Sequence, residues 1–272
     1  MNLVLAHGFL GFQHRFGIQY FHGVAEFLRH EFAHQDLRIL EAEVAPLARI
    51  GLRARQLRDQ ILAALADGRL DPREKVHIIA HSMGGLDARW CVSPGNAENI
   101  GQRVASLSTI ATPHRGSPVA DLLVARPLAS GRFLGPQHRY AALVPYLESV
   151  LGIVDLTSEG LRRFNARCPD HLQVRYFAYA GRGRQGSRPT CRLLRPCYWL
   201  VARRQGPEND GLVSVASARW GEFPEPPWPA DHADEIGHDL DHGRAAKPAF
   251  DYLARYRAIV ERLAAIPAAY AP

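Results

Sequence analysis

The chain has 272 residues, of which 47% are hydrophobic, and a formal net charge of +6 at pH 7. This length is enough to bury one sizeable core, and because no linker-like stretch divides it we predict a single domain over residues 1–272. No run approaches the roughly 20 apolar residues of a membrane-spanning helix, so we expect no transmembrane segment and at most binding to a membrane surface.

The basic excess lies partly between Arg182 and Arg204, in a segment rich in glycine and arginine. Such a run is typical of a solvated loop, and without a recognition module beside it we expect no nucleic-acid partner. Anionic lipid remains the alternative. The four cysteines have no zinc-ligand spacing, although Cys191 and Cys197 could close a small loop in an oxidising compartment.

The first strand candidate begins almost at once, since Met1-Asn2 runs directly into Leu3–Ala6. A secretory signal would place a charged stretch and a longer apolar segment there, so the sequence as written predicts a cytoplasmic protein. A mature secreted form, from which a leader has been removed, is the alternative.

Short apolar runs bounded by turn residues predict further strands, and helical patterns lie between most of them. The strand candidates are Leu3–Ala6, Leu37–Val44, Val76–His81, Val104–Ile110, Val174–Ala180 and Leu212–Val215. Apolar residues recur at helical spacing within 51–67 and 250–263. This alternation favours an α/β fold with a mostly parallel sheet that helices cover on both faces.

A sharp turn is predicted where the apolar run Val76–Ala80 meets Ser82. Such a turn strains the serine backbone so that the hydroxyl stands above the sheet, and only small residues two positions away leave room for it. Ala80 and Gly84 are small, as this nucleophile elbow requires. The alternative is a serine that merely caps the following helix.

The residues after Ser82 predict an amphipathic helix. Leu86 and Trp90 recur at helical spacing on one face. Asp87 and Arg89 are expected to point away from that face.

A long connection follows the fourth strand, and several apolar patches in it are broken by proline and glycine. We treat residues 118–165 as a candidate lid or cap over the carboxyl ends of the strands. Ordinary helical packing is the alternative.

A serine nucleophile needs a histidine base and a carboxylate that orients it. Asp210 lies in a tight Asn-Asp-Gly loop beside a strand candidate, and His232 follows in a proline-rich loop. Alone, either would more often be a turn or surface residue, and His238 lies in the same tail. Together, Ser82, Asp210 and His232 have the chain order serine, acid, histidine of α/β-hydrolases.

Negative charge that develops on a substrate carbonyl oxygen needs preorganised donors. The backbone N–H of Met83, directly after the serine, is one candidate. The loop that begins with His7-Gly8 ends the first strand, so the N–H of Phe9 should enter from the same sheet edge as the second.

Six stretches in order along the chain resemble the bacterial true lipases, the calcium-containing triacylglycerol lipases of the α/β-hydrolase fold. They are residues 7–12 (HGFLGF), 80–85 (AHSMGG), 111–117 (ATPHRGS), 157–165 (TSEGLRRFN), 209–213 (NDGLV) and 232–235 (HADE). The resemblance implies Ser82 as nucleophile, His232 as base, Asp210 as its carboxylate and an oxyanion hole from Phe9 and Met83. It also implies an acyl-ester substrate, often met at a lipid–water interface.

The chain departs from this family at the calcium site. Asp234, two residues after the histidine, matches one calcium-binding aspartate, but the segment 182–204 that should supply the second contains no Asp or Glu. A divalent cation that lacks one of two carboxylates binds far more weakly, so an arginine could stand in for its charge. The family disulfide is also unexpected, since Ala216 occupies the place of one cysteine.

These features predict a monomeric serine carboxylic-ester hydrolase, a lipase or esterase that cleaves triacylglycerols or p-nitrophenyl esters and needs no cofactor for its chemistry. An acyltransferase or polyester depolymerase would use the same triad, and a binding module that retains the scaffold without turnover is a third hypothesis.

Overall fold

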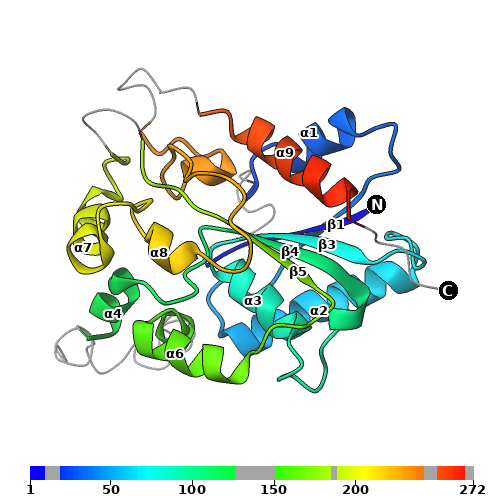
Figure 1. Ribbon diagram of the computed structural model, residues 1–272, viewed down its shortest axis with the longest axis horizontal. Coiled ribbons are helices and arrows are strands. Elements are labelled where there is room, and N and C mark those ends of the chain that lie inside the picture. Colours follow the sequence, from blue (N-terminus) through cyan, green and yellow to red (C-terminus); the bar gives the residue numbers. More distant parts are fainter. Residues whose placement is uncertain (10–18, 126–150, 185–188, 242–249, 267–272) are drawn as a thin grey trace, which may run out of the picture.

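Five parallel strands form the centre of the computed structural model, which describes residues 1–9, 19–125, 151–184, 189–241 and 250–266 (Figure 1). The strands are β1 (Asn2–Ala6), β2 (Arg38–Ala42), β3 (Val76–His81), β4 (Val104–Ile110) and β5 (Arg175–Tyr179). Their order in the sheet is β2-β1-β3-β4-β5. The predicted strands of this sheet are therefore confirmed, with ends that shift by one or two residues.

Helices cover both faces of the sheet. On one face lie α1 (Val24–Glu31) and α9 (Tyr252–Ala264), which contact each other, and on the other lie α2 (Ile50–Ala66) and α3 (Met83–Val92). Side chains alternate along each strand, so Leu5 of β1 packs towards α1 and α9 while its neighbour Val4 packs towards α2. The chain thus has the α/β-hydrolase architecture that the sequence predicts.

The remaining elements lie beyond the carboxyl ends of the strands or beside α3. They are α4 (Pro118–Ala125), α6 (Ser158–Arg167), α7 (Arg195–Gln205), α8 (Val215–Ala218) and the short 3-10 helices η1 (Gly101–Arg103) and η2 (Asp234–Ile236). Of the candidate insert 118–165, the structure describes α4, a helical stretch over 151–155 and most of α6, and residues 126–150 lie outside the described residues. Within the described chain, no helix has both the length and the apolarity to cross a bilayer.

The predicted strand Leu212–Val215 is wrong. One carboxylate oxygen of Asp210 accepts hydrogen bonds from the backbone N–H groups of Leu212 and Val213, at 2.8 and 2.7 Å. These two N–H groups are hydrogen-bonded within the turn, so they cannot pair with a neighbouring strand. Ser214 then caps α8, which begins at Val215.

Asp87 and Arg89, which the sequence places away from the apolar face of α3, are both buried, with side chains only 1% exposed. Asp87 pairs with Arg53 of α2 at 2.8 Å. Arg89 stacks on Trp220, 3.6 Å from the ring centroid, and donates to Asn165 at 2.9 Å. The helix is covered by α2 on one side and by later parts of the chain on another, which its own periodicity does not reveal.

Candidate active site

The turn at Ser82 has the strained backbone that the sequence predicts, with φ of 54° and ψ of −129°. Its N–H donates to the carbonyl of Ile110 and its own carbonyl accepts from the Thr112 hydroxyl, at 2.9 and 2.8 Å. A Cβ at Gly84 would lie 2.5 Å from the carbonyl oxygen of Ala6, so only glycine allows this approach of α3 to β1. The Ser82 hydroxyl makes no cap hydrogen bond to α3, which rules out the capping alternative.

His232 lies against Asp210 beyond the carboxyl end of the sheet. Nδ1 of His232 is 2.8 Å from Oδ2 of Asp210, and the backbone N–H of His232 donates to the Asp210 carbonyl at 3.0 Å. Because Oδ1 of Asp210 already accepts from the turn amides of Leu212 and Val213, the carboxylate has one fixed orientation. A hydrogen on Nδ1 leaves Nε2 of His232 as a proton acceptor.

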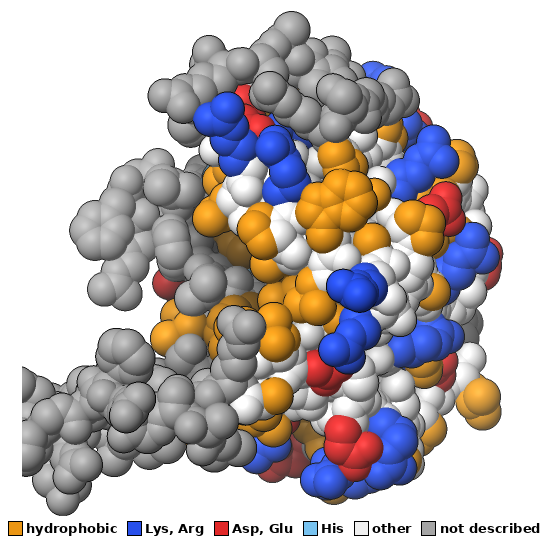
Figure 2. Space-filling model, turned by 90° about the vertical axis from the view of Figure 1, so that its left-hand side faces the viewer, with side chains coloured by type: hydrophobic (Ala, Val, Ile, Leu, Met, Phe, Trp, Pro, Cys, Tyr) orange, Lys and Arg blue, Asp and Glu red, His pale blue; other side chains and the backbone are white. Residues whose placement is uncertain are grey.

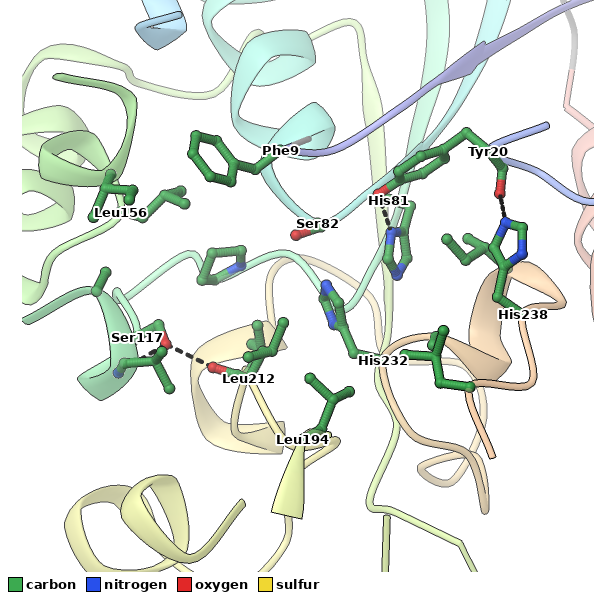
Figure 3. Close-up of a pocket in the computed structure, with 18 of the residues that line it drawn as sticks. Phe9, Tyr20, His81, Ser82, Ser117, Leu156, Leu194, Leu212, His232 and His238 are labelled. Carbon is green, nitrogen blue, oxygen red and sulfur yellow. Dashed lines mark hydrogen bonds between the residues drawn. The ribbon is translucent and has the colours of Figure 1, made fainter. Parts of the chain in front are cut away.

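Ser82 and His232 line the same cavity, which has a volume of about 850 Å³ (Figure 3). The wall is mostly apolar and includes Phe9, Leu123, Ile153, Leu156, Leu194 and Leu212. A cavity of this size and character suits a small molecule with a long apolar part. The structure thus brings the segments that carry Ser82, Asp210 and His232 together, although they are far apart in sequence.

The loop after β1 packs directly on Ser82. A Cβ added at Gly8 would lie 2.7 Å from the Cβ of Ser82, so the backbone that leads to Phe9 reaches the serine only because residue 8 is glycine. Met83 begins α3 directly after the serine. The two predicted oxyanion donors, the N–H groups of Phe9 and Met83, therefore belong to two segments that both adjoin the serine.

Arg53 supports this loop, and the sequence analysis missed it. Its fully buried guanidinium donates to the carbonyls of His7 and Gly8, at 2.8 and 3.2 Å, while Asp87 neutralises its charge. Burial, followed by the charge of Arg53, lowers the pKa of His7 to about 4. The spacing could have indicated its burial, because Arg53 is four residues before Leu57 and so lies on the same buried face of α2.

A second group of buried polar side chains lies behind His232. The Tyr20 hydroxyl is 2.8 Å from Nδ1 of His81, and Nε2 of His81 is 3.1 Å from Oε2 of Glu235. The rings of His81 and His232 are 4.5 Å apart, and Glu235 Oε2 lies 3.9 Å from Nδ1 of His232. Burial holds the pKa of His81 well below its ordinary value, and burial followed by the charge of Asp210 raises the pKa of Glu235 well above its own.

His81, His232 and Glu235 bring possible metal-ligating atoms within 4.8 Å of one another. Both nitrogens of His81 already have partners, and Nδ1 of His232 is bonded to Asp210. Most of these ligand atoms are therefore already hydrogen-bonded to one another or to Tyr20 and Asp210, and the cluster packs against the His232 ring.

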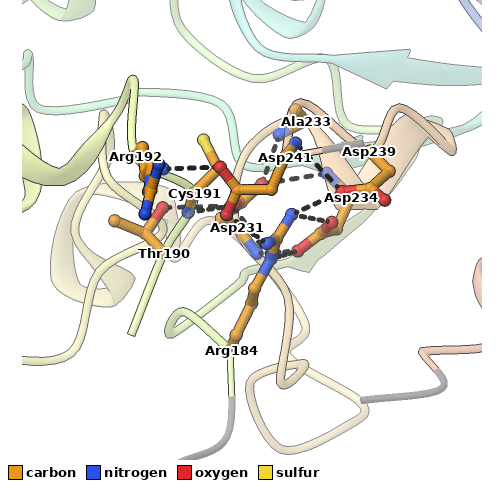
Figure 4. A network of polar contacts seen from close by, with 9 residues as sticks. All are labelled: Arg184, Thr190, Cys191, Arg192, Asp231, Ala233, Asp234, Asp239 and Asp241. Carbon is orange, nitrogen blue, oxygen red and sulfur yellow. Dashed lines mark hydrogen bonds and ion pairs between the residues drawn. The ribbon is translucent and has the colours of Figure 1, made fainter. Parts of the chain in front are cut away.

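Asp234, the sequence-predicted calcium ligand, is paired with Arg184 (Figure 4). Both carboxylate oxygens accept from the guanidinium, at 2.7 and 2.8 Å, and these bonds raise the pKa of Arg184 above its ordinary value. A side-chain cation thus already occupies the oxygens that a calcium ion would need, so the residues present do not fit the metal. Nearby Cys191 and Cys197 are both free thiols.

Comparison with known proteins gives one matching family model and several similar proteins. The model of the PGAP1-like alpha/beta domain matches residues 54–124. The chain is 33% identical over 174 residues to triacylglycerol lipase 2 of Saccharomyces cerevisiae, a match that covers 61% of this chain and 47% of the yeast protein, or about half its length. It is 28% identical over 263 residues to a triacylglycerol lipase of Vibrio cholerae, which covers 86% of this chain and 78% of that protein.

Among solved structures, lipase 1 of Pelosinus fermentans superposes with a TM-score of 0.69 over 97% of this chain and 98% of its own. The two sequences are 20% identical, so this likeness demonstrates the shared fold.

Proposed function

We propose that this chain, which is similar to bacterial triacylglycerol lipases and has their α/β-hydrolase fold, hydrolyses carboxylic esters through an acyl-enzyme on Ser82. The observation that carries the proposal is the hydrogen-bonded pair of His232 and Asp210, which shares one apolar cavity with a serine on a strained strand-to-helix turn. In this arrangement His232 can take the proton of the Ser82 hydroxyl, and the strained turn fixes the direction from which the hydroxyl attacks the substrate.

In the acylation step Ser82 Oγ attacks the ester carbonyl carbon while Nε2 of His232 takes the hydroxyl proton. Asp210 holds the imidazole in the accepting tautomer and stabilises the imidazolium that forms. Collapse of the tetrahedral intermediate breaks the bond to the alcohol oxygen, which leaves with the proton from His232. A water molecule, deprotonated by His232, then attacks the carbonyl carbon of the acyl-enzyme. Collapse of this second intermediate breaks the bond to Ser82 Oγ, which takes the proton from His232 as the carboxylic acid leaves.

The oxyanion of each tetrahedral intermediate is assigned to the backbone N–H groups of Phe9 and Met83. Support comes from the packing of Gly8 against the Ser82 side chain, which brings the Phe9 segment beside the reacting oxygen. Arg53 fixes the same segment through two carbonyls. A donor that is held before the reaction costs no reorganisation when charge develops.

The substrate is proposed to be an ester of a long-chain acid, such as a triacylglycerol. The cavity beside Ser82 is lined mainly by aliphatic and aromatic side chains, which bind acyl chains without hydrogen-bond specificity. Figure 2 shows hydrophobic side chains gathered on the face over α4 and α7, with arginines among them. Exposed Leu123, Leu193 and Trp199 belong to this side of the molecule, which suits contact with a lipid–water interface.

Substitution Ser82→Ala tests the reaction. We expect kcat for p-nitrophenyl octanoate to fall by roughly 10⁴ to 10⁶, because no other group can form the acyl-enzyme. A fluorophosphonate probe should label the unmodified protein and leave the variant unlabelled. Ser158→Ala, at an exposed serine of α6, is the matched control and should behave as the parent. Turnover that survives in Ser82→Ala would refute the proposal.

A further inference from the structure

Four aspartates surround the guanidinium of Arg184 beside the His232 loop (Figure 4). Beyond its two bonds to Asp234, Arg184 lies 3.2 Å from Asp231, 3.5 Å from Asp239 and 3.1 Å from Asp241. All five side chains are at least five-sixths buried, and Asp231 is fully buried. Several carboxylates therefore share one small, poorly solvated region.

Two of these carboxylates shape the backbone on either side of His232. Oδ1 of Asp231 accepts from the N–H groups of Ala233 and Asp234, each at 3.1 Å. Oδ2 of Asp234 accepts from the N–H of Asp231 at 3.1 Å. The carboxylates thus close the loop over residues 231–234, and the position of the His232 ring depends on their staying together.

The other contacts tie this loop to distant parts of the chain. Oδ2 of Asp231 accepts from the N–H of Cys191 at 2.8 Å, and Oδ1 of Asp241 accepts from the N–H of Arg192 at 3.0 Å. The N–H of Gly183, one residue before Arg184, donates to the carbonyl of Ala230 at 2.9 Å. The segment that carries Arg184 therefore runs alongside the entry to the His232 loop.

The carboxylates need a cation to remain together. Like charges repel more strongly in a poorly solvated region than in water, so four clustered aspartates without a cation would push the loop apart. The guanidinium of Arg184 lies within 3.5 Å of all four carboxylates and supplies the opposing charge. Because its N–H groups lie in one plane, it also fixes the directions from which the carboxylates approach.

We propose that Arg184 is a built-in cation that positions His232 for catalysis, in place of a bound divalent metal ion. The inference rests on the proposed ester hydrolysis, since it concerns the histidine of that site. Arg184 does not line the cavity, so it acts through the His232 loop and not through substrate.

The first test compares Arg184→Ala and Arg184→Lys with the parent protein. We expect kcat of Arg184→Ala to fall at least tenfold with KM within twofold, since the apolar cavity stays intact while the base loses its position. Lysine retains the charge and should recover part of kcat. Arg182→Ala removes an arginine two residues away whose side chain is 52% exposed, and it should keep the parent kcat.

The second test uses calcium chloride alone. With Arg184 gone, the carboxylate oxygens should be free to bind Ca²⁺ at millimolar concentration, which should raise the melting temperature of Arg184→Ala and restore part of its kcat. The parent should show neither effect and should lose no activity in EDTA.

Three outcomes would overturn the proposal. They are a kcat within twofold of the parent in folded Arg184→Ala, a folded Arg184→Ala whose kcat neither lysine at that position nor Ca²⁺ restores, and a parent that EDTA inactivates. Circular dichroism of each variant establishes folding. Since the parent is assayed beside Ser82→Ala, failure of the ester-hydrolase proposal would appear separately, as a parent without serine-dependent turnover.

Discussion

At the scale of single residues, the site depends on groups whose orientation is fixed by neighbours. Asp210 has both carboxylate oxygens in use, one on two turn amides and one on His232. The Ser82 backbone is held in a strained conformation by Ile110 and Thr112. Each side chain therefore meets the substrate in one geometry, which reduces the reorganisation that the reaction requires.

Substitution Asp210→Asn should lower kcat by roughly 10³ to 10⁴ with little change in KM, because an amide can hold the imidazole in the wrong tautomer. Steady-state kinetics on a p-nitrophenyl ester measure this. Asp59→Asn, at a side chain that is 62% exposed on α2, is the control and should leave kcat unchanged. A loss of less than tenfold in Asp210→Asn would mean that Asp210 does not orient the base.

At the scale of elements, the buried pair of Arg53 and Asp87 joins α2 and α3 to the loop after β1. Removing one partner of such a pair leaves an uncompensated buried charge, whereas removing both can be neutral or stabilising. The pair therefore offers a way to separate its effect on stability from its effect on the oxyanion loop.

Arg53→Met alone should reduce the free energy of unfolding by about 3 to 5 kcal/mol and also lower kcat. The double variant Arg53→Met, Asp87→Leu should regain most of the stability but not kcat, because the carbonyls of His7 and Gly8 still lack their donor. Urea unfolding and ester kinetics on the same samples provide the measurements. Full recovery of kcat in the double variant would show that Arg53 contributes only stability.

Side chains from several helices and loops form the wall of the cavity beside Ser82. The preference of the protein for a given acyl-chain length therefore depends on how these elements pack together. Each added methylene that is buried contributes about 0.8 kcal/mol, so kcat/KM should rise up to about fourfold per methylene until the cavity is filled. A series of p-nitrophenyl esters from acetate to laurate measures the slope. Leu156→Gln should flatten it, whereas Leu62→Gln, at an exposed position of α2, should not. A flat series in the parent would argue against an acyl-chain pocket.

At the scale of the whole molecule, several histidines are buried without charge. Burial, the largest cause in each case, lowers the pKa of His7 and of His77 to about 4 and holds the pKa values of His81 and His114 well below the ordinary 6.5. Each takes up a proton on unfolding below pH 6.5, so its contribution to stability is present above that pH and is lost as pH falls towards 4.

Three buried carboxyl groups act in the opposite direction. Burial raises the pKa of Asp87 to about 6, that of Glu235 well above its usual value and that of Asp234 above its usual value, so all three lose protons on unfolding in acid. Four histidines outweigh three carboxyls, and we expect the free energy of unfolding to fall between pH 6.5 and 5. Urea unfolding at several pH values measures this. His77→Leu should reduce the slope by up to about 1.4 kcal/mol per pH unit, and His34→Gln, at an exposed position, should not change it.

The sequence by itself determined the sheet, the elbow and the order of Ser82, Asp210 and His232, because apolar periodicity and turn residues are local properties. It did not determine how Asp210 folds its own turn in place of a strand, or that Asp87 is buried against Arg53. Only the tertiary structure decided the pairing of Asp87 with Arg53 and placed Arg184 among the aspartates, since partners 34 to 57 residues apart meet through the fold and leave no spacing pattern in the chain.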